Sequence, residues 1–215
     1  HVKKFKKENV ILIPNGIMIN NFKQKEQTIN FDNLTFGYVG TIGSAHNTQV
    51  ILEAAKLLKD EKNINFRIIG DGAEQKEIFK QAKQIKNIST NGLLLSDEII
   101  DEIHKIDVGL VTLKNDPLWT SALPTKMFEF LILGKPIILS IPNGGTTQMI
   151  IQNKCGLVAE VDNAISLADR VKYYSNNPHS IKTHGENGIK LISSNFNREK
   201  IAKNYLNQII KLTAN

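Results

Sequence analysis

Short apolar runs alternate with longer amphipathic segments along most of this 215-residue chain. The apolar runs have the length of buried strands and predict strands at residues 10–13, 34–39, 64–69, 87–91, 107–113, 137–141 and 157–161. The periodic segments predict helices at 48–59, 73–85, 96–105 with Ser96 as its cap, 146–153, 163–174, 178–193 and 198–212. Strands separated by helical connections of this length require parallel pairing with right-handed crossovers. The pattern therefore predicts an α/β fold with a doubly wound parallel sheet and helices on both faces.

A further predicted helix, between the strands at 107–113 and 137–141, carries two charged side chains. Lys126 and Glu129 are three residues apart, so an α-helix puts them on one side while its apolar residues face a core. Gly134 ends this helix, and Pro136 prevents its continuation. The charged pair is therefore expected on a rigid element at the edge of the sheet where open α/β sheets bind ligands.

The loops that follow the predicted strands are rich in glycine. They comprise residues 40–46, 70–73, 92–96, 114–125 and 143–148 and are expected at one edge of the sheet. Gly40 and Gly43 would let the backbone approach a phosphate at the start of the next helix, whose amides and dipole favour an anion. Tight turns alone explain the same spacing equally well. A nicotinamide-type site is disfavoured, because the full dinucleotide fingerprint is absent.

Composition narrows the class of protein. No apolar run approaches the roughly 20 residues of a membrane-spanning helix, and the single cysteine, Cys155, excludes an internal disulfide and a cysteine-based metal site. The net charge is +6, with lysines gathered near residues 3–7 and 76–86. Nucleic-acid binding is not expected, and a solvated basic face explains these lysines. The chain begins at His1 without a methionine, as a piece of a longer protein would.

Metal binding is not expected either, because the histidines lack the spacing of metal ligands. His46, on the first glycine-rich loop, has two interpretations: a donor to an oxyanion, or a solvated or capping residue. Trp119, just before the charged helix, either covers a bound sugar or anchors a core or interdomain contact.

Several short motifs occur together in an order typical of one enzyme family. They are Ile-Pro-Asn-Gly at 13–16, Gly-Tyr-Val-Gly at 37–40 with Gly43, Gly-Asp-Gly at 70–72, Pro-Thr-Lys-Met-Phe-Glu at 124–129, Gly-Lys-Pro at 134–136, Gly-Gly at 144–145 and the closing segment at 195–202. With these motifs the chain resembles the C-terminal, nucleotide-sugar-binding domain of retaining, bacterial GT-B-fold glycosyltransferases of the glycosyl transferases group 1 family. The resemblance implies a Rossmann-like sheet that forms one half of a GT-B fold.

The resemblance also implies a division of the chain into three parts. Residues 1–33 would be a lead-in and interdomain segment, and residues 34–195 the nucleotide-sugar-binding domain. Residues 196–215 would form a C-terminal helix that packs toward an N-terminal domain absent from this chain.

The same resemblance assigns a donor-nucleotide site. Glu129 matches the carboxylate that accepts hydrogen bonds from the ribose hydroxyls, and Leu94 matches the residue whose backbone meets the base. The diphosphate would meet Gly40, Thr41 and Gly43 at one loop and Thr146 and Thr147 at another, with Lys126 as its basic ligand. A structural alternative for Glu129 is an ion pair with Lys126. Catalytic residues are not assigned.

Two features depart from the family pattern. Family members often carry an arginine and a lysine on the loop after the first strand, where this chain has Thr41, Ile42, Ser44, His46 and Asn47. A second, sugar-contacting glutamate is replaced by Ser121. Lys126 is the basic residue that could substitute for the missing charge.

The expected activity is transfer of a hexosyl or N-acetylhexosaminyl group from a nucleoside-diphosphate sugar, with UDP as the expected nucleotide. The acceptor would be a glycan or a lipid-linked glycan in surface polysaccharide or lipopolysaccharide biosynthesis, and no cofactor is expected. The acceptor-binding N-terminal domain of the full-length protein would be required, so this chain alone should be inactive. A cytoplasmic location is expected, with peripheral contact at the inner face of the membrane left open. The alternatives are half of a UDP-sugar epimerase and a non-catalytic nucleotide-binding module.

Overall fold

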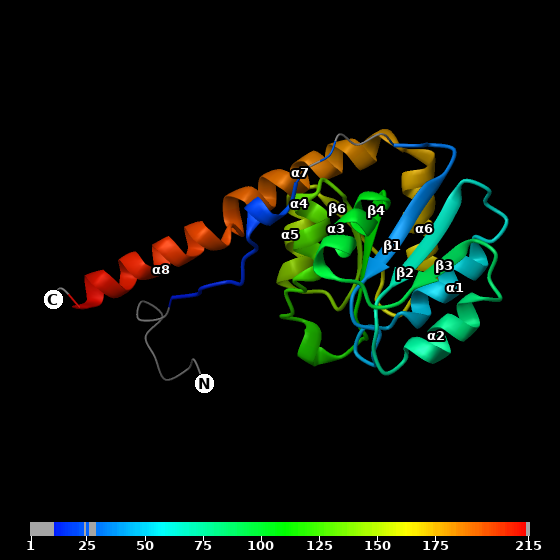
Figure 1. The fold of residues 1–215 in the computed structure, drawn as a ribbon, viewed down its shortest axis with the longest axis horizontal. Coiled ribbons are helices and arrows are strands. Elements are labelled where there is room, and N and C mark those ends of the chain that lie inside the picture. The colour runs from blue at the N-terminus through cyan, green and yellow to red at the C-terminus, as the bar shows by residue number, and fades with distance from the viewer. Residues whose placement is uncertain (1–10, 24, 26–28, 214–215) are drawn as a thin grey trace.

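The computed structural model describes residues 11–23, 25 and 29–213, and its centre is a six-stranded parallel sheet (Figure 1). The strands are β1 (Leu34–Val39), β2 (Ile64–Ile69), β3 (Ile88–Asn91), β4 (Val108–Thr112), β5 (Ile137–Ser140) and β6 (Gly156–Val158). Their order across the sheet is β3-β2-β1-β4-β5-β6, and each pair of neighbours is parallel. This order reverses between β1 and β4, which confirms the predicted doubly wound, Rossmann-like sheet.

Helices cover both faces of the sheet (Figure 1). They are α1 (Gln49–Leu57), α2 (Gln75–Ala82), α3 (Ser96–His104), α4 (Lys126–Ile132), α5 (Gly145–Gln152), α6 (Ala164–Asn176), α7 (His179–Asn195) and α8 (Arg198–Thr213), with 3-10 turns η3 (Ile19–Asn21) and η4 (Pro117–Trp119). Buried side chains of α1, α2 and α6 form one apolar cluster with one face of the sheet. Those of α3, α4 and α5 form a second cluster with the opposite face, and α7 contributes to both.

The strands produce this two-layer core because successive side chains of a strand point to opposite faces. In β5, Ile138 belongs to the first cluster and its neighbour Leu139 to the second. Gly37 of β1 and Gly109 of β4 are register partners, and a Cβ atom on Gly109 would lie 2.5 Å from the ring of Phe130. Because glycine has no side chain, α4 packs directly against the sheet here. This contact fixes the helix that carries the predicted charged pair.

The strand predicted at 10–13 is wrong for residues 11–13, which are not in a strand; Val10 lies outside the described residues. Ile17 instead forms an isolated parallel bridge with Asn197, at the start of α8. A strand needs a neighbour that accepts its hydrogen bonds, and this segment runs beside a helix start rather than beside the sheet. Pro14 also has no N–H to donate.

Two predicted element ends differ for local reasons. Ser96 is the first residue of α3 and not its cap, because the Glu98 carboxylate accepts a 2.8 Å hydrogen bond from the N–H of Leu95. β6 stops at Val158 instead of continuing to residue 161. Beyond this point the N–H of Glu160 donates a 2.9 Å hydrogen bond to the Ser166 hydroxyl instead of to a neighbouring strand.

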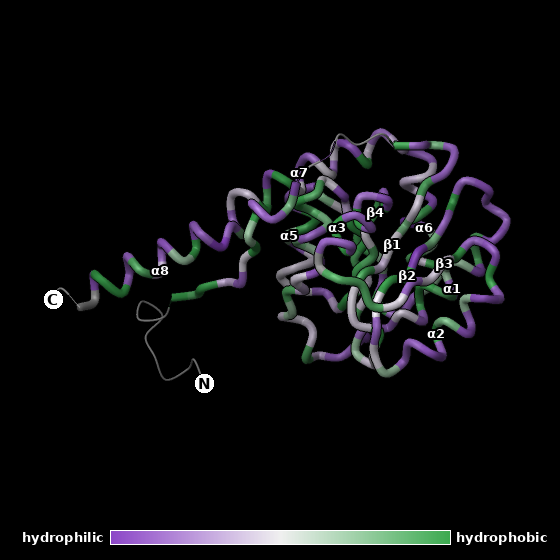
Figure 2. Tube along the Cα trace, viewed as in Figure 1, coloured by the Kyte–Doolittle hydropathy of each residue, from purple (hydrophilic) through white to green (hydrophobic). Residues whose placement is uncertain are grey.

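The last helix, α8, extends away from the rest of the domain (Figure 1), and its residues 202–211 are exposed. Hydrophobic and hydrophilic positions alternate along it (Figure 2), and Leu206 is 56% exposed. Its packing toward an N-terminal domain stays a prediction. Within the described residues, no helix combines the length and the apolar character needed to cross a membrane.

Candidate functional site

The glycine-rich loops after β1 and β2 pack against each other. Gly40 and Gly70 have φ angles of +140° and +147°, and a Cβ atom on Gly70 would lie 1.8 Å from the carbonyl oxygen of Gly40. The N–H of Ile42 also donates to the carbonyl of Asp71 at 2.8 Å. These two glycines therefore have a structural reason of their own, because no other residue adopts such angles in so little space.

Gly43 differs from them. A Cβ atom there would have its nearest neighbours at 3.8 Å, on the Thr41 side chain, and at 4.0 Å, on Nδ1 of His46. These are ordinary contact distances, so tight packing does not explain this glycine. A requirement for close approach by a ligand remains compatible with it.

Lys126 lies beneath the loop that follows β1. Its Nζ donates a 2.6 Å hydrogen bond to the Tyr38 hydroxyl and lies 4.1 Å from the centroid of the Tyr38 ring. The Tyr38 hydroxyl in turn donates to the carbonyl of Thr41 at 2.5 Å. A Cβ atom on Gly40 would lie 2.9 Å from Nζ, so the ammonium group also touches the start of the loop.

Burial shifts the pKa values of Lys126 and Tyr38. It lowers the pKa of Lys126 to about 8, although the Glu129 carboxylate favours the charged form of the lysine. Burial also raises the pKa of Tyr38 well above its ordinary value of 10.0, so this hydroxyl keeps its proton. The lysine is therefore a partly desolvated cation, which strengthens its interaction with any anion that reaches it.

A cavity of about 360 Å³ opens beside Lys126. It is lined by Thr41, His46, Val111, Thr112, Leu113, Trp119, Ala122, Leu123, Pro124, Thr125 and Lys126. Its walls are the loop after β1, the end of β4 and the segment that leads into α4. Trp119 lines this cavity and also packs against the second core cluster, so the two interpretations of this residue both fit its position.

Glu129 opens on a different cavity, of about 520 Å³, which it lines with Asn20, Asn21, Phe22, Lys23, Asp97, Ile99 and Ile100. Burial raises the pKa of its carboxyl group, and the Lys126 charge opposes this shift. Among the described residues, no ion pair joins Glu129 to Lys126. Lys126 and Glu129 therefore line two different cavities, although both are on α4. The ion pair considered for Glu129 is not formed.

Thr146 and Thr147 lie in the first turn of α5, but their hydroxyl groups are engaged within the protein. The Thr146 hydroxyl donates to the carbonyl of Ala122 at 2.6 Å. The Thr147 hydroxyl donates to the carbonyl of Gly144 at 2.9 Å and accepts its N–H at 3.0 Å. What this turn can offer an anion is its backbone amides and helix dipole.

The predicted site residues thus fall into connected groups. Gly40, Thr41 and Lys126 are in contact, and Gly43 adjoins the same loop. The α5 turn joins them through Ala122, which lines the cavity beside Lys126. Leu94 lies apart from this group, half-buried against the second core cluster.

One carboxylate that the sequence interpretation missed ties two walls of this region together. Asp162, with a φ angle of +56°, accepts hydrogen bonds from the side chain of Asn47 and, at 3.0 Å, from the N–H of Asn115. Asn47 itself has a φ angle of +41°. Two strained residues from distant parts of the chain thus meet where the loop after β1 approaches the loop after β4. An aspartate after a short strand carries no sequence signal for such a role.

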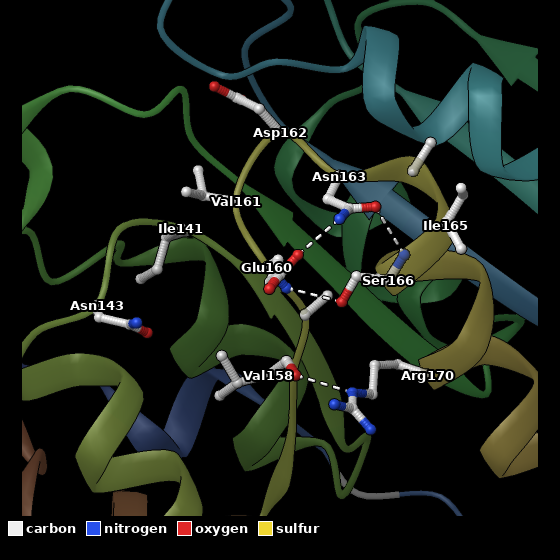
Figure 3. A pocket seen from close by; sticks show the side chains of 12 residues that line it. Ile141, Asn143, Val158, Glu160, Val161, Asp162, Asn163, Ile165, Ser166 and Arg170 are labelled. Carbon is white, nitrogen blue, oxygen red and sulfur yellow. Dashed lines mark hydrogen bonds between the residues drawn. The ribbon is translucent and has the colours of Figure 1, made fainter.

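A larger cavity, of about 780 Å³, lies on the other side of Asp162, between the ends of β5 and β6 and the start of α6 (Figure 3). Its polar side chains largely bind one another or the backbone. Asn163 donates to the Glu160 carboxylate at 2.6 Å, and Arg170 Nε donates to the carbonyl of Val158 at 2.9 Å. Figure 3 shows the Asp162 side chain pointing away from Glu160 and Asn163.

In the described part of the chain, no group of three His, Cys, Asp or Glu residues could hold a metal ion.

Known proteins are similar to this chain over most of its length. The chain is 28% identical over 197 residues to an uncharacterized glycosyltransferase of Methanocaldococcus jannaschii, which covers 90% of this chain and 51% of the relative. It is 23% identical over 211 residues to a poly(ribitol-phosphate) alpha-N-acetylglucosaminyltransferase of Staphylococcus aureus, over 96% of this chain and 40% of the relative. The chain therefore spans about half the length, or less, of these curated relatives.

Solved structures share the fold. The C-terminal domain of a glycosyl transferase group 1 family protein from Francisella tularensis has a TM-score of 0.68 and 18% identity, over 85% of this chain and all of that one. An Anabaena protein in complex with UDP-glucose has a TM-score of 0.76 and 16% identity, over 96% of this chain and 58% of that one.

The family model described as glycosyl transferases group 1 matches residues 20–191. This match includes the whole parallel sheet, α4 and the glycine-rich loops. The chain belongs to the glycosyl transferases group 1 family and has the α/β fold of the C-terminal half of its GT-B members.

Proposed function

We propose that this chain is the donor-binding half of a glycosyltransferase that transfers a hexosyl or N-acetylhexosaminyl group from a nucleoside-diphosphate sugar, with UDP as the nucleotide. The observation that carries the proposal is the position of Lys126. Its ammonium group is held by Tyr38 under the loop that starts at Gly40, beside a cavity lined by no acidic residue in the described part of the chain. Such a surrounding favours an anionic ligand.

In this proposal, Lys126 and Glu129 of α4 would contact two different parts of the nucleotide sugar. The diphosphate would meet Lys126, the backbone of Gly40, Thr41 and Gly43, and the amides of the first turn of α5 at Thr146 and Thr147. Glu129, one helical turn further on, would accept hydrogen bonds from the ribose hydroxyls, and the backbone at Leu94 would meet the base. In this arrangement the spacing of Lys126 and Glu129 on α4 would set the distance between the bound phosphate and the ribose.

These groups also suit the departure of a nucleoside diphosphate. Negative charge develops on the diphosphate as the bond to the sugar breaks, and fixed amides, a helix dipole and a partly buried lysine stabilise it without reorganisation. The proposal therefore needs no metal and no cofactor. The two known proteins that support it are the poly(ribitol-phosphate) alpha-N-acetylglucosaminyltransferase, through its named reaction, and the Anabaena protein, through its UDP-glucose.

The rest of the reaction is assigned to the remainder of a longer protein. A glycan or lipid-linked acceptor of surface polysaccharide biosynthesis would bind to an N-terminal domain, at the cytoplasmic side of the membrane. α8 would pack toward that domain through apolar side chains such as Tyr205 and Leu206, which are 49% and 56% exposed. Transfer by the present chain alone should be negligible.

A thermal-shift panel tests the donor assignment. UDP at about 100 times its dissociation constant should stabilise the chain by about 2.7 kcal/mol, whereas GDP and CMP at equal concentration should not. Equal stabilisation by all nucleotides would support a general nucleotide-binding module. Conversion of a UDP-sugar to its epimer without any acceptor would instead support the epimerase alternative.

A further inference from the structure

The cavity beside Lys126 holds a second residue that can carry positive charge. Of the described residues that line it, His46 and Lys126 are the ones with ionisable side chains near neutral pH, and none is acidic. The carboxylate that favours the charged form of Lys126, Glu129, lines the other cavity. Two cations in the first cavity would therefore repel each other, and an anion that enters it would relieve this repulsion.

The backbone on either side of His46 is held firmly. Its N–H donates to the carbonyl of Gly43 at 2.9 Å, and its carbonyl accepts a hydrogen bond from the buried hydroxyl of Thr112 on β4. The carbonyl of Ala45 accepts the N–H of Lys114 at 2.9 Å. His46, which lines the cavity, is therefore held on a fixed loop, close to Gly43.

The side chain itself is not satisfied. Nδ1 of His46 is buried and has no hydrogen-bond partner among the described residues. An unpaired buried nitrogen of this kind destabilises the fold, so a purely structural histidine would be expected to have a partner. A phosphate oxygen that enters the cavity would supply one.

The surrounding charges do not offer an internal partner. Lys126 of α4 is the charged group that acts on His46, and it repels the protonated form. The carboxylates on the adjoining elements are engaged elsewhere: Asp162 with Asn47 and Asn115, Asp71 with the N–H of Gly72, Asp116 with the N–H of Leu118, and Glu129 at the second cavity.

We propose that His46 is a second cationic ligand of the donor diphosphate and that it takes up a proton when the diphosphate binds. This inference rests on the proposed function, because it concerns the same site.

The pH range of the effect follows from the two cations. Burial and the Lys126 charge place the pKa of His46 below its ordinary value of 6.5 before the ligand binds. A diphosphate beside the ring would raise this pKa, so UDP affinity should fall as the pH rises from about 6 to 8. Lys126, with a pKa of about 8, would add a separate fall at higher pH. Each unit by which UDP raises the pKa of His46 corresponds to a tenfold change in affinity.

Calorimetry can count the protons. UDP is titrated into the chain at constant pH in buffers of different ionisation enthalpy, with His46→Asn and the unsubstituted chain compared. Proton uptake near pH 7 should be smaller in His46→Asn by up to about one proton per UDP, and its affinity should vary less between pH 6 and 8. The ionisation of UDP itself is common to both chains and cancels. Equal uptake by both would overturn the proposal.

A matched control and a direct measurement complete the test. His179 is an exposed residue of α7 that contacts Phe31, before β1, at the opposite edge of the sheet, so His179→Asn should behave as the unsubstituted chain. If His46→Asn fails to fold, NMR titration of the unsubstituted chain decides, because the imidazole resonances of His46 should report a higher pKa with UDP than without. An unchanged pKa overturns the proposal.

The two proposals fail in different ways. If the unsubstituted chain does not bind UDP at any pH, the proposed function and this inference are both wrong. If UDP binds, and Glu129→Gln weakens the binding, while the His46 pKa does not respond, the donor assignment stands and only the role of His46 is wrong.

Discussion

Lys126 donates a hydrogen bond of 2.6 Å to the hydroxyl of Tyr38 while its ammonium group also lies 4.1 Å from the centroid of the same ring. One tyrosine thus holds the lysine by two kinds of contact, and it does so at the end of β1, the strand next to the reversal of strand order. A flexible side chain with four rotatable bonds is thereby fixed in one position, which reduces the entropy lost when an anion binds.

Replacing Lys126 should separate stability from binding. Lys126→Met removes a buried charge at the cost of a cation–π contact, so the free energy of unfolding at pH 7 should rise by about 1–2 kcal/mol. UDP binding should be lost. Denaturation curves and UDP titrations measure the two effects. A less stable variant that still binds UDP normally would contradict both parts.

The same substitution predicts a pH dependence of stability. The folded chain binds the Lys126 proton less tightly, with a pKa of about 8, than the unfolded chain, where the ordinary value is 10.5. The destabilisation of the unsubstituted chain is therefore full below about pH 8 and disappears as the pH rises through the unfolded value. The stability difference between Lys126→Met and the unsubstituted chain should shrink accordingly between pH 8 and 10.5 in urea titrations.

Glu129→Gln tests the ribose contact. The substitution keeps the shape of the side chain but removes its charge, so UDP binding should weaken by about 1.5–3 kcal/mol. The free energy of unfolding should not fall, because no ion pair with Lys126 is broken and burial disfavours the charged carboxylate. Glu53→Gln, at an exposed position of α1, is the matched control. Unaltered UDP affinity in folded Glu129→Gln would remove the carboxylate from the proposed site.

Chelation tests the absence of a metal from the proposed chemistry. If amides, helix dipole and Lys126 neutralise the diphosphate, the dissociation constant of UDP should be the same with and without EDTA in calorimetry. A loss of tenfold or more, about 1.4 kcal/mol, would point to a cation held by carboxylates.

The alternating pattern of the sequence predicted the fold well, because the strand and helix periods of a doubly wound sheet are local properties. The spacing of Lys126 and Glu129 likewise placed both on one helix. Tyr38 was not predicted, since 88 positions separate it from Lys126 and only the folded sheet brings them together. The strand predicted at 10–13 was wrong for the opposite reason, because apolar character alone does not provide a partner.

Spacing could not distinguish the roles of the glycines. Gly43 and Gly70 both follow a strand, yet a Cβ atom has ordinary contacts at Gly43 and lies 1.8 Å from a carbonyl oxygen at Gly70. The difference depends on how two loops from separate parts of the chain meet. Backbone strain and three-dimensional packing therefore decide what the sequence left open.

These two glycines give a paired prediction. Gly70→Ala should destabilise the chain by about 3 kcal/mol or more, because the residue needs both a positive φ angle and the space of a hydrogen atom. Gly43→Ala should cost less than about 1 kcal/mol and should weaken UDP binding through reduced backbone approach. Melting curves with UDP titrations compare them. A severe folding defect in Gly43→Ala would show that this glycine is structural too.

Asp162 joins the loops after β1 and β4, so its removal should loosen the cavity walls. Asp162→Ala should lower the free energy of unfolding by about 1–2 kcal/mol and weaken UDP binding about tenfold. Asp169→Ala, at an exposed position of α6, serves as the control. Hydrogen exchange should increase in residues 40–47 and 114–123 of Asp162→Ala alone. Unchanged exchange there would show that the loops hold without this carboxylate.

The bridge between Ile17 and the start of α8 has a mechanical consequence. The N–H of Ile17 donates to the carbonyl of Phe196 at 2.8 Å, and the N–H of Arg198 donates to the carbonyl of Ile17 at 3.0 Å. The chain therefore enters and leaves the sheet domain at one point. A domain connected to the sheet through both segments would rotate about this point, and the two segments would bend together. Such a rotation would require torsion changes near residues 17 and 197, and the sheet and its glycine-rich loops would move as one unit.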